Sequence, residues 1–98
     1  MARVSVIMGV YNCKNPQLLK KSVDSIIKQT FTDWEFIICN DGSTDDTLQL
    51  LNEVAQSDSR IKVISYQQGR GLAYALNRCI KASTGEYIAR QDDDDISE

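Results

Sequence analysis

Four consecutive aspartates, at positions 92–95, are the residues of this chain whose type and spacing most clearly predict chemistry. Adjacent carboxylates repel one another and cannot be buried unpaired. A hard divalent cation prefers oxygen ligands, and one held by carboxylates commonly contacts a phosphate-bearing substrate. A run of like charges is, however, more often a solvated acidic tail. The surrounding sequence therefore has to decide between a metal site and a tail.

Asp41 is a second candidate, because it follows a strand-like apolar segment and precedes Gly42. An Asp-Gly pair is common in turns, where the Asp side chain caps nearby backbone groups. The functional alternative is a carboxylate that accepts a hydrogen bond from a nucleobase or a ribose. The residues alone leave these two interpretations evenly balanced.

The sequence Gly69-Arg70-Gly71 precedes a helix-like segment, and helix N-termini attract phosphate groups. The dinucleotide-binding fingerprint needs a third glycine at position 74, where this chain has Tyr74, and no Walker-type Gly-Lys-Ser/Thr is present. An ordinary turn is therefore the better default at this position.

Composition restricts the class of protein. The 98 residues are enough for one domain, and 42% hydrophobic with 26% charged residues is a globular composition. The four aspartates exceed the whole net charge of −3, so the rest of the chain is nearly neutral and has no basic face for nucleic acid. The apolar runs are too short to cross a membrane, and no signal peptide is recognisable.

The three cysteines, Cys13, Cys39 and Cys79, are odd in number and lack CxxC spacing, which argues against zinc and against a disulfide framework. We therefore predict a reducing, cytoplasmic location, and we interpret Cys39 and Cys79 as small core hydrophobes. The chain has no histidine, which excludes Ser-His-Asp and Cys-His catalysis within it.

The elements that would position these residues alternate along the chain. Apolar, β-forming segments predict strands at 4–10, 34–39, 61–66 and 86–89. Helical spacing predicts three intervening helices. The first begins at Asn15 and Pro16, the second is capped from residues 43–46, and Gly85 ends the third. The expected apolar stripes comprise Leu19, Val23, Ile26 and Ile27, then Leu48, Leu51 and Val54, then Leu72, Leu76, Cys79 and Ile80.

This order predicts an α/β fold with a mostly parallel sheet of β-α-β-α-β-α-β connectivity. Such sheets bind ligands at the carboxyl ends of their strands. All four predicted strand ends carry polar or glycine-rich sequence, at 11–12, 40–43, 68–71 and 92–95, whereas the opposite loops resemble plain connectors. This asymmetry favours a site, with the acidic run as one wall, over a tail.

Four motifs in this order, at 4–12, 40–47, 76–78 and 85–95, resemble the family 2 glycosyltransferases. The resemblance covers almost the whole chain and implies a Rossmann-like A-type fold that binds a nucleoside-diphosphate sugar. It implies inverting transfer of the sugar to a glycan or lipid-linked acceptor, with a UDP-sugar as the favoured donor. The implied metal is Mn²⁺ or Mg²⁺, which neutralises the departing diphosphate.

The resemblance also assigns roles to residues. Val10 and Tyr11 would lie against the nucleobase, and Asp41 would bond its N–H. Asp92 and Asp93 fall on the ribose and diphosphate side of an Asp-x-Asp motif, in which Asp94, together with Asp92, would hold the metal. The complete donor-binding set is Val10, Tyr11, Asn12, Asp41, Gly71, Asp92 and Asp93.

Some positions depart from the family pattern. Gly9 stands where proline is usual, and Gly69 stands where asparagine is common, which puts the contact of the 69–71 loop in doubt. Cys79 replaces a common glycine, and Asp93 replaces a more frequent alanine or serine. None of these changes removes a carboxylate.

The chain ends at Glu98, shortly after the acidic run. We therefore expect residues 1–98 to be the donor-binding part of a glycosyltransferase domain, with the acceptor half and the general base beyond residue 98. Such a part would bind donor without turnover, and it would self-associate through the face that the missing half covers.

Two other classes of function stay open at this point. Receiver-like phosphoryl-transfer domains also place acids on a parallel sheet, but they need acids after the first strand, where this chain has Tyr11 and Asn12. A non-catalytic module whose acidic end binds a basic partner is the third alternative.

Overall fold

The computed structural model describes residues 4–13, 15–28, 33–44 and 46–90. Strands and helices alternate along them: β1 (Val4–Val10), α1 (Pro16–Ile27), β2 (Trp34–Asp41), α2 (Thr47–Gln56), β3 (Ile61–Tyr66), α3 (Leu72–Ala82) and β4 (Tyr87–Arg90). The strands form one sheet in the order β3-β2-β1-β4, and every pairing is parallel. The predicted α/β fold and its β-α-β-α-β-α-β connectivity are therefore confirmed.

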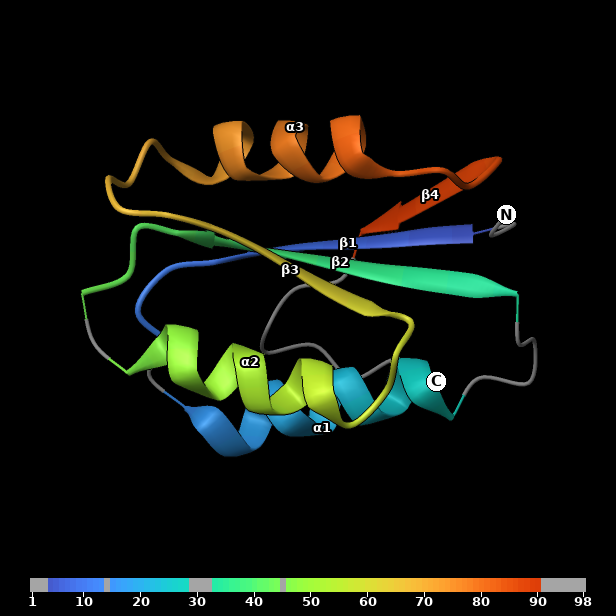
Figure 1. Ribbon diagram of the computed structural model, residues 1–98, viewed down its shortest axis with the longest axis horizontal. Helices are drawn as coiled ribbons and strands as arrows, with labels where there is room; N and C mark the ends of the chain where they lie inside the picture. The colour runs from blue at the N-terminus through green and yellow to red at the C-terminus, as the bar shows by residue number, and fades with distance from the viewer. Residues whose placement is uncertain (1–3, 14, 29–32, 45, 91–98) are drawn as a thin grey trace.

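The helices cover both faces of this sheet. Figure 1 shows α1 and α2 below the strands and α3 above them. From β1 the chain moves to β2 and β3 on one side, and then returns to place β4 on the other side of β1. In open α/β sheets a ligand crevice lies at such a reversal, outside the carboxyl ends of the strands. The carboxyl ends of β1 and β4 therefore mark the expected site.

The core has two halves because alternate residues of a strand face opposite sides of the sheet. Val6, Met8 and Phe36 face α1 and α2 and belong to the larger cluster. Ile7 and Ile37 face α3 and pack with Cys39, Ala75 and Cys79. Both Cys39 and Cys79 are fully buried, so their interpretation as core hydrophobes is confirmed.

The start of α1 follows the prediction, because the Asn15 side chain accepts a hydrogen bond from the Leu18 N–H at 3.2 Å. The start of α2 differs. Asp46 precedes this helix without a side-chain capping bond. Ser43 and Thr44, two other expected caps, bond Asn12 instead, and Asp45 lies outside the described residues.

The prediction that Gly85 ends the third helix was wrong. The helix α3 ends at Ala82, and Ser83 leaves it with extended backbone angles. Gly85 instead lies against β1, where an added Cβ would come within 2.6 Å of the Ser5 Oγ. The absence of a side chain at this position permits a close approach rather than a helix stop.

The apolar stripe of α3 is narrower than predicted. Ala75 and Cys79 are buried, but Leu72 and Ile80 remain 48% and 43% exposed. Within the described part of the chain, α3 has no helix beside it on its face of the sheet. The apolar residues at the sides of its stripe therefore have no neighbouring helix to bury them. Leu48 of α2 is also exposed. None of the helices described is both long and apolar enough to span a membrane.

Candidate functional site

The end of β1 presents two different side chains at the carboxyl edge of the sheet. Val10 is buried in the larger core cluster, so a ligand at this edge would meet its main chain rather than its side chain. Tyr11 is 57% exposed, and its ring is accessible at the same edge. Of the predicted base-binding pair, Tyr11 is therefore the residue that offers a surface for stacking.

Asn12 connects the loop after β1 with the loop after β2. It has a left-handed backbone (φ 46°), which Asn tolerates better than most residues. The Asn12 N–H donates to Ser43 Oγ at 2.9 Å, and its Oδ1 accepts from the Thr44 N–H at 2.9 Å. Next to it, the Cys13 N–H donates to Thr47 Oγ1 at 2.9 Å. Asn12 thus holds two site loops together.

Asp41 is the last residue of β2, and its carboxylate is buried at the carboxyl edge. Its Oδ1 accepts from the Tyr66 hydroxyl at 2.5 Å and from the Arg70 N–H at 2.8 Å. Its Oδ2 accepts from the Gly71 N–H at 2.9 Å. The side chain therefore fixes the loop that follows β3, which is a structural role that neither sequence interpretation included.

The same contacts leave Asp41 ionised and able to bind a further donor. Burial alone raises the pKa of this carboxyl, but the hydrogen bonds from Arg70, Tyr66 and Gly71 outweigh it and lower the pKa below its ordinary value. A carboxylate has about four lone-pair sites. The three donors above occupy two sites on Oδ1 and one on Oδ2, so Oδ2 retains capacity for one N–H of a ligand.

The residues 69–71 form a turn that packs tightly on the end of β2. An added Cβ at Gly42 would lie 2.2 Å from the Gly69 N, and Gly42 has φ 67°. Gly71 has φ 97° and ψ 161°, a conformation essentially restricted to glycine. Because the N–H groups of Arg70 and Gly71 point to Asp41, these two groups do not form a phosphate cradle, and the geometry favours the ordinary turn.

Aromatic rings and arginines flank this turn. Tyr66 and Tyr74 meet edge to face with their centroids 5.5 Å apart. The Arg70 guanidinium lies 5.6 Å from the Tyr74 ring centroid, and that of Arg78 lies 5.9 Å from the Tyr66 centroid. These contacts place two guanidinium groups against the tyrosine rings that flank the turn.

The acidic run lies outside the described residues, so Asp92, Asp93 and Asp94 are not placed. The last described strand, β4, ends at Arg90, which pairs with Ile7 of β1. In the part of the chain that the structure describes, no cluster of three His, Cys, Asp or Glu could hold a metal ion. The metal prediction thus rests on the acidic run, whose all-carboxylate donor set suits a hard cation such as Mn²⁺ or Mg²⁺.

Sequence reasoning missed two polar residues that build this architecture. Tyr66 ends β3 and bonds Asp41, but a tyrosine at a strand end is not distinctive in sequence. Glu35 lies in the fully buried strand β2. An isolated charge between Trp34 and Phe36 was a detectable signal, because an acid inside an apolar strand is rarely buried without partners.

Comparison with known sequences decides the family. The model of the family described as "Glycosyl transferase family 2" matches residues 5–98. This chain belongs to glycosyltransferase family 2. The resemblance inferred from the four motifs is therefore confirmed.

Two relatives illustrate the range of this similarity. The chain is 48% identical over 96 residues to EpsE of Bacillus subtilis (strain 168), covering 97% of this chain and 34% of that protein. It is 40% identical over 93 residues to the UDP-Glc:alpha-D-GlcNAc-diphosphoundecaprenol beta-1,3-glucosyltransferase WfgD of Escherichia coli, covering 95% and 35%. The chain thus spans about a third of the length of these relatives.

Solved structures of glycosyltransferases share the fold. The mannosyltransferase PcManGT from Pyrobaculum calidifontis, in complex with GDP-Man and Mn²⁺, superposes with a TM-score of 0.85 at 26% identity, covering 96% of this chain and 28% of that one. S. aureus TarS in complex with UDP-GlcNAc gives 0.84 at 28% identity, covering 96% and 27%. The A-type glycosyltransferase fold of this family member is confirmed.

Proposed function

We propose that this chain is the donor-binding part of an inverting glycosyltransferase and that its ligand is a nucleoside-diphosphate sugar, with UDP-sugars favoured. One observation carries the proposal. An ionised, buried carboxylate with one remaining acceptor site, Asp41, lies at the carboxyl edge of a parallel sheet, beside an exposed aromatic ring, Tyr11. A carboxylate that accepts an N–H and a ring that stacks are the two features that a nucleobase requires.

The neighbouring proteins support this choice of donor. WfgD is named for UDP-Glc, and the TarS structure holds UDP-GlcNAc. PcManGT was solved with GDP-Man, and one carboxylate can also accept an N–H from guanine. We favour uridine for this chain, and competition between UDP and GDP would test that preference.

The acidic run would supply the metal site. Asp94 and Asp92 would hold Mn²⁺ or Mg²⁺, with Asp93 on the ribose and diphosphate side. The ion would neutralise the diphosphate as it leaves the anomeric carbon. The chain's own described residues would bind the base and orient the nucleotide across the ends of β1, β2 and β3.

The second half of the reaction would lie with residues beyond this chain. The acceptor hydroxyl attacks the anomeric carbon in line while a carboxylate base takes its proton, and we place that base after residue 98. The acceptor would be a glycan or a lipid-linked sugar, in keeping with the diphosphoundecaprenol acceptor in the name of WfgD. The three cysteines, odd in number and without CxxC spacing, fit a cytoplasmic location.

Calorimetric titration with UDP, in Mn²⁺ and then in EDTA, tests the proposal. We expect the full chain to bind UDP more tightly with Mn²⁺, because a carboxylate run without a metal repels a diphosphate. Asp94→Asn should abolish this gain, whereas Asp58→Asn, at the opposite edge of the sheet, should preserve it. Equal affinity in Mn²⁺ and EDTA would contradict the metal assignment.

The apolar surface gives a second, independent test of the domain assignment. Leu72 and Ile80 of α3 and Ile88 of β4 are all exposed on the α3 side of the sheet. We propose that the acceptor half would cover this face and that the 98-residue chain self-associates through it. Sizing chromatography should show a concentration-dependent species larger than a monomer, and a clean monomer at all concentrations would contradict this.

A further inference from the structure

The strand β4 lacks the feature that ordinarily fixes the register of a strand. Register is specified where one face of a strand is buried, because a slip of one residue would expose the buried set. All four residues of β4 are exposed. The strand pairs with β1 alone among the described strands, from Val4 opposite Tyr87 to Ile7 opposite Arg90. Contacts other than a buried face must therefore help to set where β4 lies on β1.

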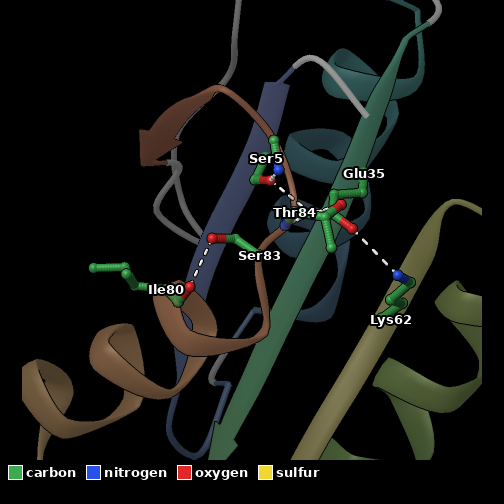
Figure 2. Close-up of polar contacts among 7 residues, drawn as sticks. Ser5, Glu35, Lys62, Ile80, Ser83 and Thr84 are labelled. Carbon is green, nitrogen blue, oxygen red and sulfur yellow. Dashed lines mark hydrogen bonds and ion pairs between the residues drawn. The ribbon is translucent and has the colours of Figure 1, made fainter. Parts of the chain in front are cut away.

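A buried carboxylate at the amino edge of the sheet, Glu35, provides contacts of this kind. Glu35 of β2 is only 5% exposed, and its Oε2 accepts from the Ser5 hydroxyl at 2.6 Å and from the Thr84 N–H at 2.6 Å. The Thr84 hydroxyl donates to the same oxygen at 3.1 Å. Figure 2 shows Ser5, Glu35, Thr84 and Lys62 converging from three strands and from the segment that leads into β4. The Lys62 Nζ completes the group by donating to Oε1 at 3.2 Å.

Ser5 extends the network to the next residue of that segment. The Gly85 N–H donates to Ser5 Oγ at 2.8 Å, while the Ser5 hydroxyl donates to Glu35. A Cβ at Gly85 would lie 2.6 Å from the Ser5 Oγ and 2.7 Å from the Ser5 N. Two consecutive residues before β4 are thus fixed to β1 and β2, and the closeness of their approach depends on glycine. Consecutive bonds of this kind also strengthen one another.

We propose that Glu35 and Ser5 are positioning residues for the donor site, because they fix the register of β4 and so the point from which the chain continues into the acidic run. This role rests on the function proposed above. Two residues separate Thr84, which bonds Glu35, from the start of β4 at Tyr87. In the sequence, one residue separates the end of β4 at Arg90 from Asp92. A slip of one residue would shift β4 by about 3.3 Å along β1.

The network differs from a general stabilising contact in what it joins. The ion pair of Asp58 with Arg60 is also at the amino edge, with Nη2 and Oδ2 2.7 Å apart, but it joins residues of one short segment. Glu35 joins β1, β2 and β3 to the segment before β4. Removal of the Glu35 carboxylate should therefore affect the carboxyl edge of the sheet, whereas removal of the Asp58 carboxylate should not, even where the two changes lower stability by similar amounts.

The test compares Ser5→Ala, Glu35→Gln and Gly85→Ala with the control Asp58→Asn in the full chain. Hydrogen exchange measures protection of the β4 amides that pair with β1, and calorimetry measures UDP affinity with Mn²⁺ and with EDTA. Ser5→Ala is a small change that should still fold, and Glu35→Gln keeps an oxygen acceptor for Ser5 and Thr84. Gly85→Ala perturbs the same contact by steric overlap instead of by loss of a bond.

We expect Ser5→Ala and Gly85→Ala to lose β4 protection and to weaken Mn²⁺-assisted UDP binding by about tenfold or more. This is the size of effect seen when a group that orients a metal ligand is removed. Affinity in EDTA should stay within about twofold of the unchanged chain, because Tyr11 and Asp41 are unaltered. Glu35→Gln should have a smaller effect of the same kind, and Asp58→Asn should behave like the unchanged chain.

Failure of the proposed function and failure of the positioning role would give different results. If the unchanged chain shows no gain from Mn²⁺, the proposed function fails and the positioning role fails with it. If the gain is present and persists in Ser5→Ala and Gly85→Ala with β4 still protected, the positioning role alone is overturned. A folded variant that loses affinity equally in Mn²⁺ and EDTA would also overturn it, because the loss would then reflect general damage.

Discussion

The two edges of this sheet each contain a buried carboxylate, and the carboxylates differ in how completely their acceptor sites are used. Glu35 at the amino edge receives four hydrogen bonds, from Ser5, Lys62 and both the N–H and the hydroxyl of Thr84. Asp41 at the carboxyl edge receives three from the described residues. The four bonds to Glu35 equal in number the roughly four acceptor sites of a carboxylate, with three of them sharing Oε2, and we call Glu35 saturated in this sense. Asp41 retains one site on Oδ2, where ligands bind in folds of this kind.

This difference shows how one chemical group can serve two purposes within a small domain. Both carboxylates hold a loop: Glu35 holds the entry to β4, and Asp41 holds the turn at residues 69–71. A saturated carboxylate contributes to stability and geometry. A partly saturated carboxylate is held in place equally well, but it can also accept a hydrogen bond from a ligand. Because folding has already ordered its side chain, binding does not have to order it again.

The largest expected effect is on stability, from Glu35→Leu. This variant leaves the Ser5 hydroxyl and the Thr84 N–H without their buried acceptor, so we expect the free energy of unfolding to fall by about 2–5 kcal/mol. Urea denaturation followed by circular dichroism measures it. A loss below about 1 kcal/mol would show that water or other groups replace the carboxylate, and the contrast between the two edges would not hold.

Acid provides a second way to break the amino-edge network. Burial raises the pKa of Glu35, but the hydrogen bonds from Ser5, Thr84 and Lys62 outweigh this and lower the pKa to about 2 from an ordinary 4.5. A lowered pKa stabilises the fold above the ordinary value, and this stability is lost as the pH falls from about 4.5 towards 2. We expect Glu35 to contribute about 3 kcal/mol at neutral pH by this linkage.

Glu35→Gln removes the group that titrates, so the pH dependence of its stability can be compared with that of the unchanged chain. The difference in unfolding free energy between the unchanged chain and Glu35→Gln should shrink as the pH falls below about 4.5. Chemical denaturation at a series of pH values between neutrality and acid measures it. A difference that is constant over this range would show that Glu35 has an ordinary pKa in the folded chain.

A smaller effect, on ligand binding, is expected from Asp41→Ala. Loss of a hydrogen bond from the base to a charged acceptor should weaken UDP binding by about 1–3 kcal/mol. Tyr66→Phe is the matched control, because it removes one of the internal bonds to Asp41 and leaves the carboxylate in place. Tyr66→Phe should retain most of the affinity, because Arg70 and Gly71 still bond Asp41. An unchanged UDP affinity in Asp41→Ala would show that Asp41 only holds the 69–71 turn.

The smallest expected effect is from Lys62→Met. The Lys62 side chain is 58% exposed, and exposed ion pairs are typically worth less than about 1 kcal/mol. Stability should therefore change little, and β4 should stay protected from hydrogen exchange. A loss as large as that in Glu35→Leu would mean that the ion pair, and not the bonds to Ser5 and Thr84, dominates the amino-edge network.

The parts of the fold that follow from local pattern could be predicted from the sequence. Nearly continuous apolar runs correctly located β1, β2 and β3, and the pair Asn15 and Pro16 correctly located the start of α1. Connectivity and parallel pairing followed because short links between alternating strands and helices allow few arrangements. The family followed from four motifs in order, and the comparison confirmed it.

Contacts between distant residues could not be predicted in the same way. The sequence predicts a helix stop at Gly85 because glycine often follows helices, but its role depends on Ser5, eighty positions earlier in the chain. The loop contacts of Asn12 and the saturation of Glu35 likewise depend on residues about thirty or more positions away. Local propensity contains no information on such pairs, and these pairs build most of the candidate site.

The most direct test of the central claim is a nitrogen–proton correlation titration of the full chain with UDP and Mg²⁺. We predict that the perturbed amides cluster at the carboxyl edge, at Tyr11, Asn12 and residues 69–71, while those of Ser5 and Thr84 at the amino edge stay in place. Perturbations centred on Ser5 and Thr84, or none at saturating UDP, would contradict the assignment of the carboxyl edge as the donor site.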